Sequence, residues 1–272
     1  MTVDGALGLA RTLGVERLDA TVLLAHHLGQ RREWLLAHGD DAIDGATQAR
    51  FEADCRRRLD DVPLAYLTRT REFHGLTLEV DPVVLVPRVD TETLADWAIE
   101  VVRALLANTP RPRVIDLGTG SGALALAIAA ACPAAVVTGT DASQAALFVA
   151  SRNAQRLGLS VQWRPGDWWD AVAGERFDLA ISNPPYIAAD DPHLHALRHE
   201  PRQALVAADN GLAALAAIVA RAQSHLSGWL LLEHGWNQAA AVHKLLLDAG
   251  MTLPETRIDL AGQVRCSGGR LG

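Results

Sequence analysis

The sequence predicts an α/β protein with a doubly wound, mostly parallel sheet, preceded by a small helical domain and a β-hairpin linker. Apolar strand-like runs alternate with helical patterns from about residue 114 to residue 249, which is the order of βαβ units. A glycine-rich turn follows the first run, and the N-terminal residues carry only helical periodicity. We therefore expect a helical domain over 1–72, a hairpin linker over 73–88 and an α/β domain over 89–272.

The N-terminal region carries two apolar stripes at helical spacing. The first comprises Leu7, Leu9, Ala10 and Leu13, and the second Leu18, Val22, Leu23, Leu24 and Leu28. Gly14 and Gly29 follow the stripes, where glycine commonly ends a helix. Further helical patterns cover Trp34–Leu36 and Ala46–Leu59. These patterns predict a small helical bundle without a catalytic constellation.

The linker and the next helix are marked by a change of period after Glu72. The expected elements are a strand over 73–80, a turn at Asp81-Pro82, a strand over 83–86 and a helix over 94–106. Thr91 or Thr93 is available as the N-cap of that helix. The two strands predict a β-hairpin between the domains.

The remaining residues alternate between strands and helices. The expected strands cover 114–117, 136–141, 161–164, 177–182 and 229–233, and the expected helices begin at Ala123 or cover 145–157, 211–226 and 238–249. Strands separated by helices pair in parallel, because a crossover is needed to return the chain to the same edge.

Composition excludes several classes of protein. The chain has 272 residues, 49% of them hydrophobic, and a net charge of −7, so it has no general electrostatic attraction to nucleic acid or to anionic membranes. Its three scattered cysteines have no metal-ligand spacing and favour a reducing, cytoplasmic compartment. Asp4 stands where a secretory signal would be basic, and the apolar run Ala123–Val137 is too short to span a bilayer.

Two short basic clusters leave an alternative open. Arg56–Arg58 and Arg111–Arg113 are either solvated surface or a local nucleic-acid patch. We expect solvated surface, because nothing nearby resembles a DNA-recognition module.

The stretch Asn183-Pro184-Pro185-Tyr186 directly follows the predicted strand 177–182. Proline lacks a backbone donor and cannot continue a sheet, so the chain leaves the sheet at a strand's carboxyl end, where α/β proteins bind ligands. The Asn183 amide oxygen and the Pro184 carbonyl can each accept one N–H of a planar NH2 group, while Tyr186 packs against its flat face. The alternative is a proline-rich turn without chemistry.

The turn after the first strand reads Gly118-Thr119-Gly120-Ser121-Gly122. Glycines let the backbone approach a ligand closely, but the spacing does not fit a dinucleotide fingerprint and no phosphate-binding lysine follows. Asp141, at the end of the second strand, can accept both hydroxyls of a ribose. Asp167 can accept from an adenine amino group, with Trp168 covering the ring. The alternatives are a helix cap for Asp141 and core packing for Trp168 and Trp169.

Ligand contact is the interpretation we favour. A nucleoside without a diphosphate, beside an acceptor for NH2, indicates S-adenosyl-L-methionine as cofactor. Polar side chains at 190–199 (Asp190, Asp191, His193, His195 and His199) offer a metal site as an alternative, but we expect a mobile loop over the acceptor pocket and no metal. Glu233 and His234 end the last strand, and we expect them to support the sheet edge.

Several motifs together resemble one family. They are Pro63–Leu67, Arg71–Gly75, Val86–Arg88, Asp116–Gly122, Ser182–Ile187, Asp191–Leu194, Glu200-Pro201 with Ala204-Leu205, and Leu231–Gly235. On these motifs the chain resembles the HemK/PrmC release-factor glutamine methyltransferases over nearly its whole length. Asn-Pro-Pro-Tyr is shared with adenine-N6 DNA methyltransferases, whereas the hairpin segment and Glu233-His234-Gly235 are more specific. Val89 stands where the family usually has proline.

The resemblance implies a Rossmann-like, S-adenosylmethionine-dependent methyltransferase domain. It implies that the cofactor lies against Gly118–Gly122, with Asp141 on its ribose and Trp168 and Asn183 lining its pocket. It also implies that residues 183–186 hold the Gly-Gly-Gln glutamine of a bacterial peptide chain release factor, which is methylated on its side-chain nitrogen (N5). The helical domain would grip the rest of that protein. We expect a cytoplasmic monomer with no direct nucleic-acid partner and no membrane partner.

Three other functions compete with this expectation. The same chemistry can act on a ribosomal-protein glutamine, and adenine-N6 methylation of DNA uses the same acceptor logic on a flipped base. The net charge of −7 argues against DNA. A cofactor-binding regulator without catalysis is the remaining alternative, and the intact acceptor stretch and glycine loop argue against it.

Overall fold

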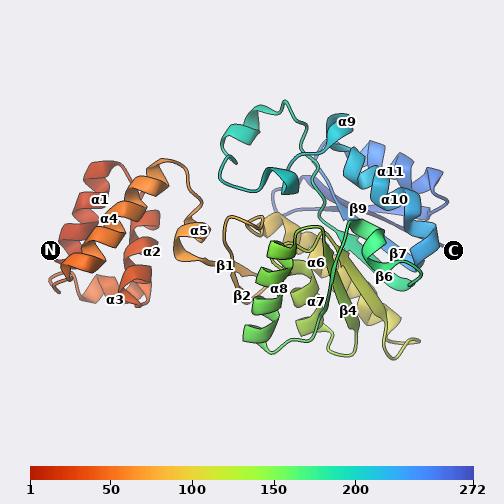
Figure 1. Cartoon of the computed structure of the whole chain (residues 1–272), viewed down its shortest axis with the longest axis horizontal. Helices are drawn as coiled ribbons and strands as arrows, with labels where there is room; N and C mark the ends of the chain where they lie inside the picture. Colours follow the sequence, from red (N-terminus) through yellow and green to blue (C-terminus); the bar gives the residue numbers. More distant parts are fainter. The chain divides into compact units, whose positions relative to one another are not determined.

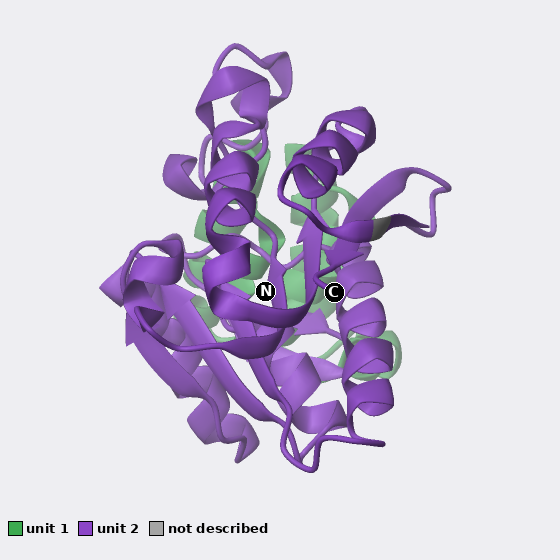
Figure 2. Ribbon diagram, turned by 90° about the vertical axis from the view of Figure 1, so that its right-hand side faces the viewer, with its two compact units in different colours: residues 1–70 green, residues 71–272 purple. Residues whose placement is uncertain are grey.

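The chain divides into two units, residues 1–70 and residues 71–272 (Figures 1 and 2). This computed structural model describes residues 1–252 and 254–272 in full. The division falls close to residue 72, where the helical periodicity predicted the end of the first domain.

Unit 1 consists of helices only. They are α1 (Val3–Leu13), α2 (Arg17–Leu28), α3 (Arg32–Ala37), α4 (Gly45–Leu59) and α5 (Leu64–Thr68). The Thr2 and Asp44 side chains cap α1 and α4 by accepting from backbone N–H groups of their first turns. Gly14 and Gly29 end α1 and α2 in the left-handed conformation, with φ of 94° and 63°, as predicted.

The buried face of α1 differs from the predicted one. Val3, Ala6 and Ala10 are fully buried, whereas the expected Leu7, Leu9 and Leu13 are only half-buried. The small alanine side chains allow α1 to lie close to α2 and α4. Leu18, also expected in the core, is 58% exposed. The sequence pattern predicted the helix and the burial of Ala10 correctly, but the leucines that it also assigned to the buried face of α1 are only half-buried.

The hairpin lies earlier in the chain than predicted. Its strands are β1 (Thr70–Phe73) and β2 (Leu76–Glu79), joined at His74 and Gly75, both with positive φ. The predicted strand over 83–86 is wrong, because these residues form turns and irregular chain. Pro82 and Pro87 interrupt possible pairing, since proline has no N–H to donate.

Seven strands of unit 2 form one sheet in the order β5-β4-β3-β6-β7-β9-β8. They are β3 (Arg113–Leu117), β4 (Val136–Asp141), β5 (Gln162–Pro165), β6 (Phe177–Ser182), β7 (Leu226–Glu233), β8 (Thr252–Ile258) and β9 (Val264–Arg270). β3 to β7 pair in parallel, close to their predicted positions, which confirms the doubly wound, mostly parallel sheet.

The antiparallel strands β8 and β9 were not predicted. β9 contains Ser267-Gly268-Gly269, a composition that is poor in strand-forming residues. The glycine is required by packing, because a Cβ at Gly268 would lie 2.5 Å from Leu231 and 2.8 Å from Trp97. Tertiary contacts thus decide this strand.

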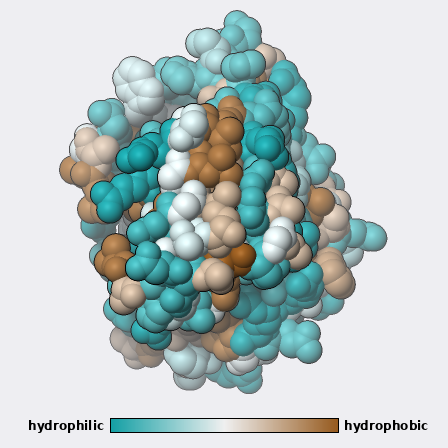
Figure 3. Space-filling view, turned by 90° about the vertical axis from the view of Figure 1, so that its left-hand side faces the viewer, coloured by the Kyte–Doolittle hydropathy of each residue, from teal (hydrophilic) through white to brown (hydrophobic). Residues whose placement is uncertain are grey.

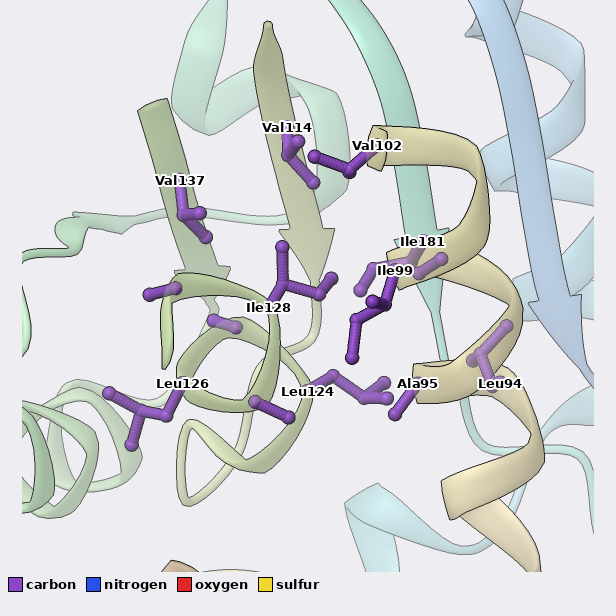
Figure 4. Packing of buried hydrophobic residues seen from close by; sticks show 14 of the residues in the cluster. Leu94, Ala95, Ile99, Val102, Val114, Leu124, Leu126, Ile128, Val137 and Ile181 are labelled. Carbon is purple, nitrogen blue, oxygen red and sulfur yellow. The ribbon is translucent and has the colours of Figure 1, made fainter. Parts of the chain in front are cut away.

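Helices cover both faces of the sheet. They are α6 (Glu92–Leu105), α7 (Ala123–Ala131), α8 (Gln144–Leu157), α9 (Ala208–Gly211), α10 (Ala213–His225) and α11 (Ala239–Asp248), with short 3₁₀ turns η1 (Val89–Thr91), η2 (Trp168–Val172), η3 (Pro192–His195) and η4 (Arg202–Ala204). Val114, Val137 and Ile181 point toward α6 and α7 (Figure 4). Their strand neighbours Ile115 and Ala180 pack with residues of α10 and α11 on the opposite face.

The order of the strands reverses between β3 and β6, because β4 lies on one side of β3 and β6 on the other. Such a reversal opens a crevice at the carboxyl ends of the two strands. The Ser182 hydroxyl joins these ends by donating to the Leu117 carbonyl at 2.6 Å. Gly118 and Asn183, the next residues of each strand, therefore begin at the crevice.

The molecular surface in Figure 3 is mostly hydrophilic, with smaller hydrophobic patches between the polar residues. Among the described residues, no helix combines the length and the apolar character that crossing a membrane requires.

Candidate active site

A cavity of about 300 Å³ lies within unit 2 at the carboxyl ends of the parallel strands. Its lining comes from the ends of β3, β4, β5 and β6, and from two further segments, residues 83–91 and 201–204. The predicted site residues that line it are Gly118, Thr119, Gly120, Ser121, Asp141, Asp167, Trp168, Asn183 and Pro185. Gly122, Pro184 and Tyr186 lie outside the lining. Residues 118–121 and two of the four acceptor residues, Asn183 and Pro185, thus line one cavity.

The glycine loop, residues 118–122, is shaped by hydrogen bonds of its own backbone. The N–H groups of Gly118 and Thr119 both donate to the Thr140 carbonyl, at 2.9 and 2.8 Å. Gly118 has a φ of 74°, and a Cβ there would lie 3.0 Å from the Trp168 ring. Gly122 instead caps α7, where a Cβ would lie 3.1 Å from Ala150. Gly118 therefore opens the cavity, and Gly122 packs the helix behind it.

Asp141 holds the loop as well as lining the cavity. Its Oδ2 accepts from the Gly120 N–H at 2.9 Å and its Oδ1 from the Ser143 N–H at 2.8 Å. Burial raises the pKa of Asp141, whereas these two hydrogen bonds lower it. The cap of α8 is Ser143, whose hydroxyl accepts from Ala146 N–H at 3.2 Å, so Asp141 is not the helix cap.

Two adjacent tryptophans separate into different environments. Trp168 is half-buried, lines the cavity and has a φ of 44°. Trp169 is fully buried and donates from Nε1 to the Ile218 carbonyl at 2.8 Å. Trp169 therefore packs in the core. The exposed Asp167 and the half-buried Trp168 line the cavity instead.

Asp116 is a site residue that the sequence reasoning did not single out. It is 1% exposed and lines the cavity at the end of β3. Its Oδ2 accepts from the Thr119 hydroxyl at 2.5 Å and from the Ala125 N–H at 3.2 Å. Oδ1 is buried without a hydrogen-bond partner, and burial raises the pKa of Asp116 to about 7. An acid at the end of an apolar strand, just before the glycine loop, was the available signal.

The turn formed by residues 183–186, called the acceptor turn below, is fixed through its side chains. Asn183 donates from Nδ2 to the Thr91 hydroxyl oxygen at 3.2 Å, which leaves the Asn183 amide oxygen as an acceptor. Thr91, one of the two threonines expected to cap α6, is at the N-cap but makes no side-chain capping bond there. The Tyr186 hydroxyl donates to Glu233 Oε1 at 3.1 Å. Burial is the main cause of the raised pKa of Tyr186, which keeps the phenol protonated.

The backbone of the turn is held from behind. Gln238 donates from Nε2 to the Tyr186 carbonyl at 3.1 Å. Gly211, with φ of 84°, presses on the same carbonyl, and a Cβ there would lie 2.0 Å from its oxygen. Ile187 adds two backbone hydrogen bonds, with Leu205 at 2.9 Å and Ala207 at 3.0 Å. These contacts leave the turn little freedom to move.

Two lining segments are joined by an ion pair between the buried Glu200 and the partly exposed Arg88. Glu200 is 7% exposed, pairs with the Arg88 guanidinium and accepts from the Val86 N–H at 3.1 Å. The pair ties the chain after β2 to the segment before η4, and both segments line the cavity. The sequence marked Arg88 and Glu200 as motif residues without relating them to each other.

Comparisons with known proteins agree with this geometry. A family model described as the PrmC N-terminal domain matches residues 7–68, and one described as the methyltransferase small domain matches residues 89–207. The release factor glutamine methyltransferase of Bordetella pertussis is 49% identical, over 95% of this chain and 96% of the relative. That of Escherichia coli K12 is 41% identical, over 93% of this chain and 92% of the relative.

The chain belongs to the release factor glutamine methyltransferase family. Solved structures share the fold at low identity. The catalytic domain of human Mettl16 in complex with an RNA hairpin is 18% identical with a TM-score of 0.55, covering 84% of this chain and 82% of that chain. A T. thermophilus 16S rRNA methyltransferase in complex with AdoMet and guanosine is 20% identical with a TM-score of 0.53, covering 75% of this chain and 50% of that chain. These likenesses identify the methyltransferase fold of the family.

Four arginines of the two basic clusters pair with acids. Arg56, Arg57 and Arg58 contact Glu52, Asp54 and Asp19 at 3.3, 3.0 and 2.6 Å, and Arg113 contacts Glu175. Paired guanidinium groups contribute less to an attraction for phosphates, so these clusters fit the solvated-surface interpretation.

The histidines of residues 190–199 are not grouped as metal ligands in the described part of the chain. His193 Nδ1 pairs with Asp191 Oδ1 at 2.7 Å, and the His193 side chain is 86% exposed. Among the described residues, no three His, Cys, Asp or Glu side chains are arranged to hold a metal ion.

Proposed function

We propose that this protein transfers a methyl group from S-adenosyl-L-methionine to the side-chain amide nitrogen (N5) of a glutamine in bacterial peptide chain release factors. One observation carries the proposal: the glycine loop and Asn183 open on the same cavity. Relatives named release factor glutamine methyltransferase match nearly the whole chain. The reaction therefore brings a cofactor and a planar amide together at the carboxyl ends of β3 and β6.

The cavity suits S-adenosyl-L-methionine, which supplies a methyl group on a positively charged sulfur. Asp116 Oδ1 is buried and unpaired, so it can accept from the ammonium of the methionine part. Gly118 lets the backbone approach the ligand, and Asp141 can accept from the ribose hydroxyls. Asp167 and Trp168, which also line the cavity, can bind the adenine amino group and cover its ring. A partner for the buried oxygen is what the cofactor provides.

The acceptor turn handles the glutamine. A carboxamide nitrogen is a weak nucleophile, because its lone pair is delocalised into the carbonyl. Asn183 Oδ1 and the Pro184 carbonyl accept its two N–H bonds, while Pro185 lines the cavity beside it and Tyr186 supports the turn from outside the lining. These bonds strengthen as the nitrogen gains positive charge, so they stabilise the transition state more than the ground state. They also hold the nitrogen in line with the methyl group, at about 3–3.5 Å.

The proton balance is simple. S-adenosyl-L-methionine would supply the methyl group to the nitrogen, and its sulfur would keep the electron pair of the broken sulfur–methyl bond. The nitrogen is then cationic and loses one proton to water, so the acceptor turn needs no general base. Placement and electrostatics do the work of the site.

We infer that unit 1 binds the rest of the release factor. Residues 7–68 match the PrmC N-terminal domain, and this helical unit contains no catalytic group of the proposed reaction. We further propose that the protein acts as a cytoplasmic monomer without a nucleic-acid partner. Cys55, Cys132 and Cys266 are all buried and free, which suits a reducing compartment, and light scattering in solution would test the monomer.

The test is methyl transfer from labelled S-adenosyl-L-methionine to purified, unmodified release factor, followed by peptide mass mapping. DNA and ribosomal protein are offered in parallel, and a release factor whose Gly-Gly-Gln glutamine is replaced by alanine is the control. One methyl on that glutamine, absent from the control, is the expected result. Label on DNA or ribosomal protein alone would contradict the proposed substrate, and bound cofactor without any transfer would favour a binding-only regulator.

A further inference from the structure

The acceptor turn forms hydrogen bonds with a group of largely buried polar side chains from three other elements of unit 2. Thr91 comes from η1, Glu233 from the end of β7 and Arg265 from β9. The parallel pairing of β6 with β7 brings Asn183 and Glu233 to the same end of the sheet. Glu233 is 1% exposed and Thr91 is 4% exposed. A carboxyl group buried this deeply requires a specific reason.

The hydrogen bonds of this group have a direction. Asn183 Nδ2 donates to Thr91 Oγ1 at 3.2 Å, and the Tyr186 hydroxyl donates to Glu233 Oε1 at 3.1 Å. Glu233 Oε2 is buried without a hydrogen-bond partner, and the Thr91 hydroxyl is among the groups that lower the pKa of Glu233. A carboxylate can only accept. If the Thr91 hydroxyl donates its one hydrogen bond to Glu233, its oxygen can only accept from Asn183.

Building on the proposed function, we propose that Glu233 is a positioning residue that orients the Asn183 amide through the Thr91 hydroxyl. The carboxylate accepts a hydrogen bond from the Thr91 hydroxyl, the Thr91 oxygen accepts from the Asn183 NH2 group, and the Asn183 amide oxygen faces the glutamine. The same carboxylate holds Tyr186. With the amide reversed, Asn183 would present NH2 to the glutamine NH2, and two donors would meet.

This orientation depends on the charge of Glu233. Burial raises the pKa of Glu233 to about 7; the Thr91 and Tyr186 hydroxyls and the Arg265 guanidinium lower it, and Asp90 raises it. The remaining titratable neighbours are Cys266, which follows Arg265 in β9, and Asp259, which pairs with Arg265 at 3.1 Å. A protonated Glu233 can donate to Thr91, and the direction of the hydrogen bonds that link Asn183, Thr91 and Glu233 is then no longer fixed. Methyl transfer should therefore rise with pH as Glu233 ionises.

Glu233→Gln tests the role, because glutamine keeps the shape but can donate to Thr91. The matched control is Glu255→Gln, at an exposed residue of β8. Single-turnover methyl transfer at saturating cofactor is measured from about pH 6 to about pH 8.5, with cofactor Kd from calorimetry. Glu233→Gln should slow transfer about tenfold to a hundredfold at high pH, leave Kd unchanged and flatten the pH profile. The control should behave as wild type.

Thr91 variants separate orientation from mere stability. Thr91→Ser keeps the hydroxyl and should retain transfer, whereas Thr91→Val should lose about as much as Glu233→Gln. The double variant Glu233→Gln with Thr91→Val should lose no more than Thr91→Val alone, because both act through one chain of hydrogen bonds. Additive losses, or a wild-type rate and pH profile in Glu233→Gln, would overturn the proposal. If Glu233→Gln fails to fold, the comparison of serine with valine at position 91 decides.

A readout without substrate keeps this inference separate from the proposed function. The side-chain NH2 signals of Asn183 in ¹⁵N NMR spectra of the cofactor-bound protein should shift with a midpoint near pH 7. Glu233→Gln should abolish that shift. Signals that do not respond to pH in the wild type would overturn the orientation role. A wild-type protein that shows the shift but methylates no release factor would contradict the proposed function alone.

Discussion

The two sides of the cavity are built by different means. On the cofactor side, backbone groups of consecutive residues do most of the work: Gly118 and Thr119 donate to Thr140 of the neighbouring strand. On the acceptor side, side chains meet from distant parts of the chain. Asn183 bonds to Thr91, 92 positions earlier, and Tyr186 bonds to Glu233, 47 positions later.

The difference predicts different sensitivities. A backbone-built loop changes little when nearby side chains are altered, unless a glycine or the acid that holds the loop is lost. A turn held by single side-chain hydrogen bonds can lose its geometry through one remote substitution. Substitutions on the cofactor side should therefore appear in cofactor binding, and those on the acceptor side in the rate of transfer.

Asn183→Ala should give the largest effect and the sharpest separation of the two sides. It removes the acceptor that stabilises the charged nitrogen, so transition-state stabilisation should fall by about 2–4 kcal/mol. Cofactor affinity should weaken only modestly, although Asn183 also lines the cavity. Single-turnover kinetics and calorimetry measure the two quantities. Near-wild-type turnover in this variant would remove Asn183 from the proposed mechanism.

Asp141→Ala should give the opposite pattern. The variant loses the proposed ribose contact and also the acceptor that holds the Gly120 N–H at 2.9 Å. Cofactor binding should weaken by about 1.5–3 kcal/mol, the usual range for a hydrogen bond to a charged group. Transfer at saturating cofactor should change much less. Asp248→Ala, at an exposed ion pair on α11, is the control. An unchanged Kd would contradict the ribose assignment.

The same contrast explains what the sequence could predict. Gly118–Gly122 and Asp141 are adjacent to strands, so local patterns were sufficient to find them. The acceptor stretch was also visible, but its supports were not, because Thr91 and Glu233 reach it only through the folded sheet. Asp116 was quoted within a motif, yet its unpaired oxygen is a property of burial rather than of spacing.

The fold shows the same limit. Four of the five parallel strands follow from apolar runs, β5 being the short and polar exception, whereas β8 and β9 depend on packing around a glycine-rich segment that has low strand propensity. The hairpin was displaced for a local reason: His74 and Gly75 adopt positive φ and close a tight turn inside what looked like one continuous alternating strand. In unit 1, small alanines rather than leucines form the close contact of α1.

The pH dependence of cofactor binding gives a smaller, more specific test of the cofactor side. Burial raises the pKa of Asp116 to about 7, so Asp116 is protonated at lower pH and cannot hold an ammonium as an ion pair. Cofactor Kd should rise by up to about tenfold for each pH unit below 7, which corresponds to about 1.4 kcal/mol. Asp116→Asn should bind weakly at every pH. A wild-type Kd that stays constant from about pH 6 to about pH 8 would contradict the ammonium contact.

The stability of the free protein should move in the reverse direction. Between the ordinary carboxyl pKa near 4 and about 7, folded protein holds more protons on Asp116 and Glu233 than the unfolded chain does. The free energy of unfolding should therefore fall as pH rises through this window. Chemical denaturation at several pH values measures it, and Asp116→Asn should remove part of the slope.

Tyr186→Phe should have the smallest effect and tests how the acceptor side divides its work. The aromatic ring remains, but the hydrogen bond to Glu233 Oε1 is lost, which should cost about 1 kcal/mol of stability. Since Glu233 then loses a donor to its charged form, its pKa should rise further, and the pH at which transfer reaches half its maximum should rise with it. Cofactor Kd should stay at the wild-type value, because Tyr186 does not line the cavity. An unchanged rate with no change in that midpoint would mean that Tyr186 acts only through its ring, and Thr91 would then be the one hydroxyl through which Glu233 reaches the acceptor turn.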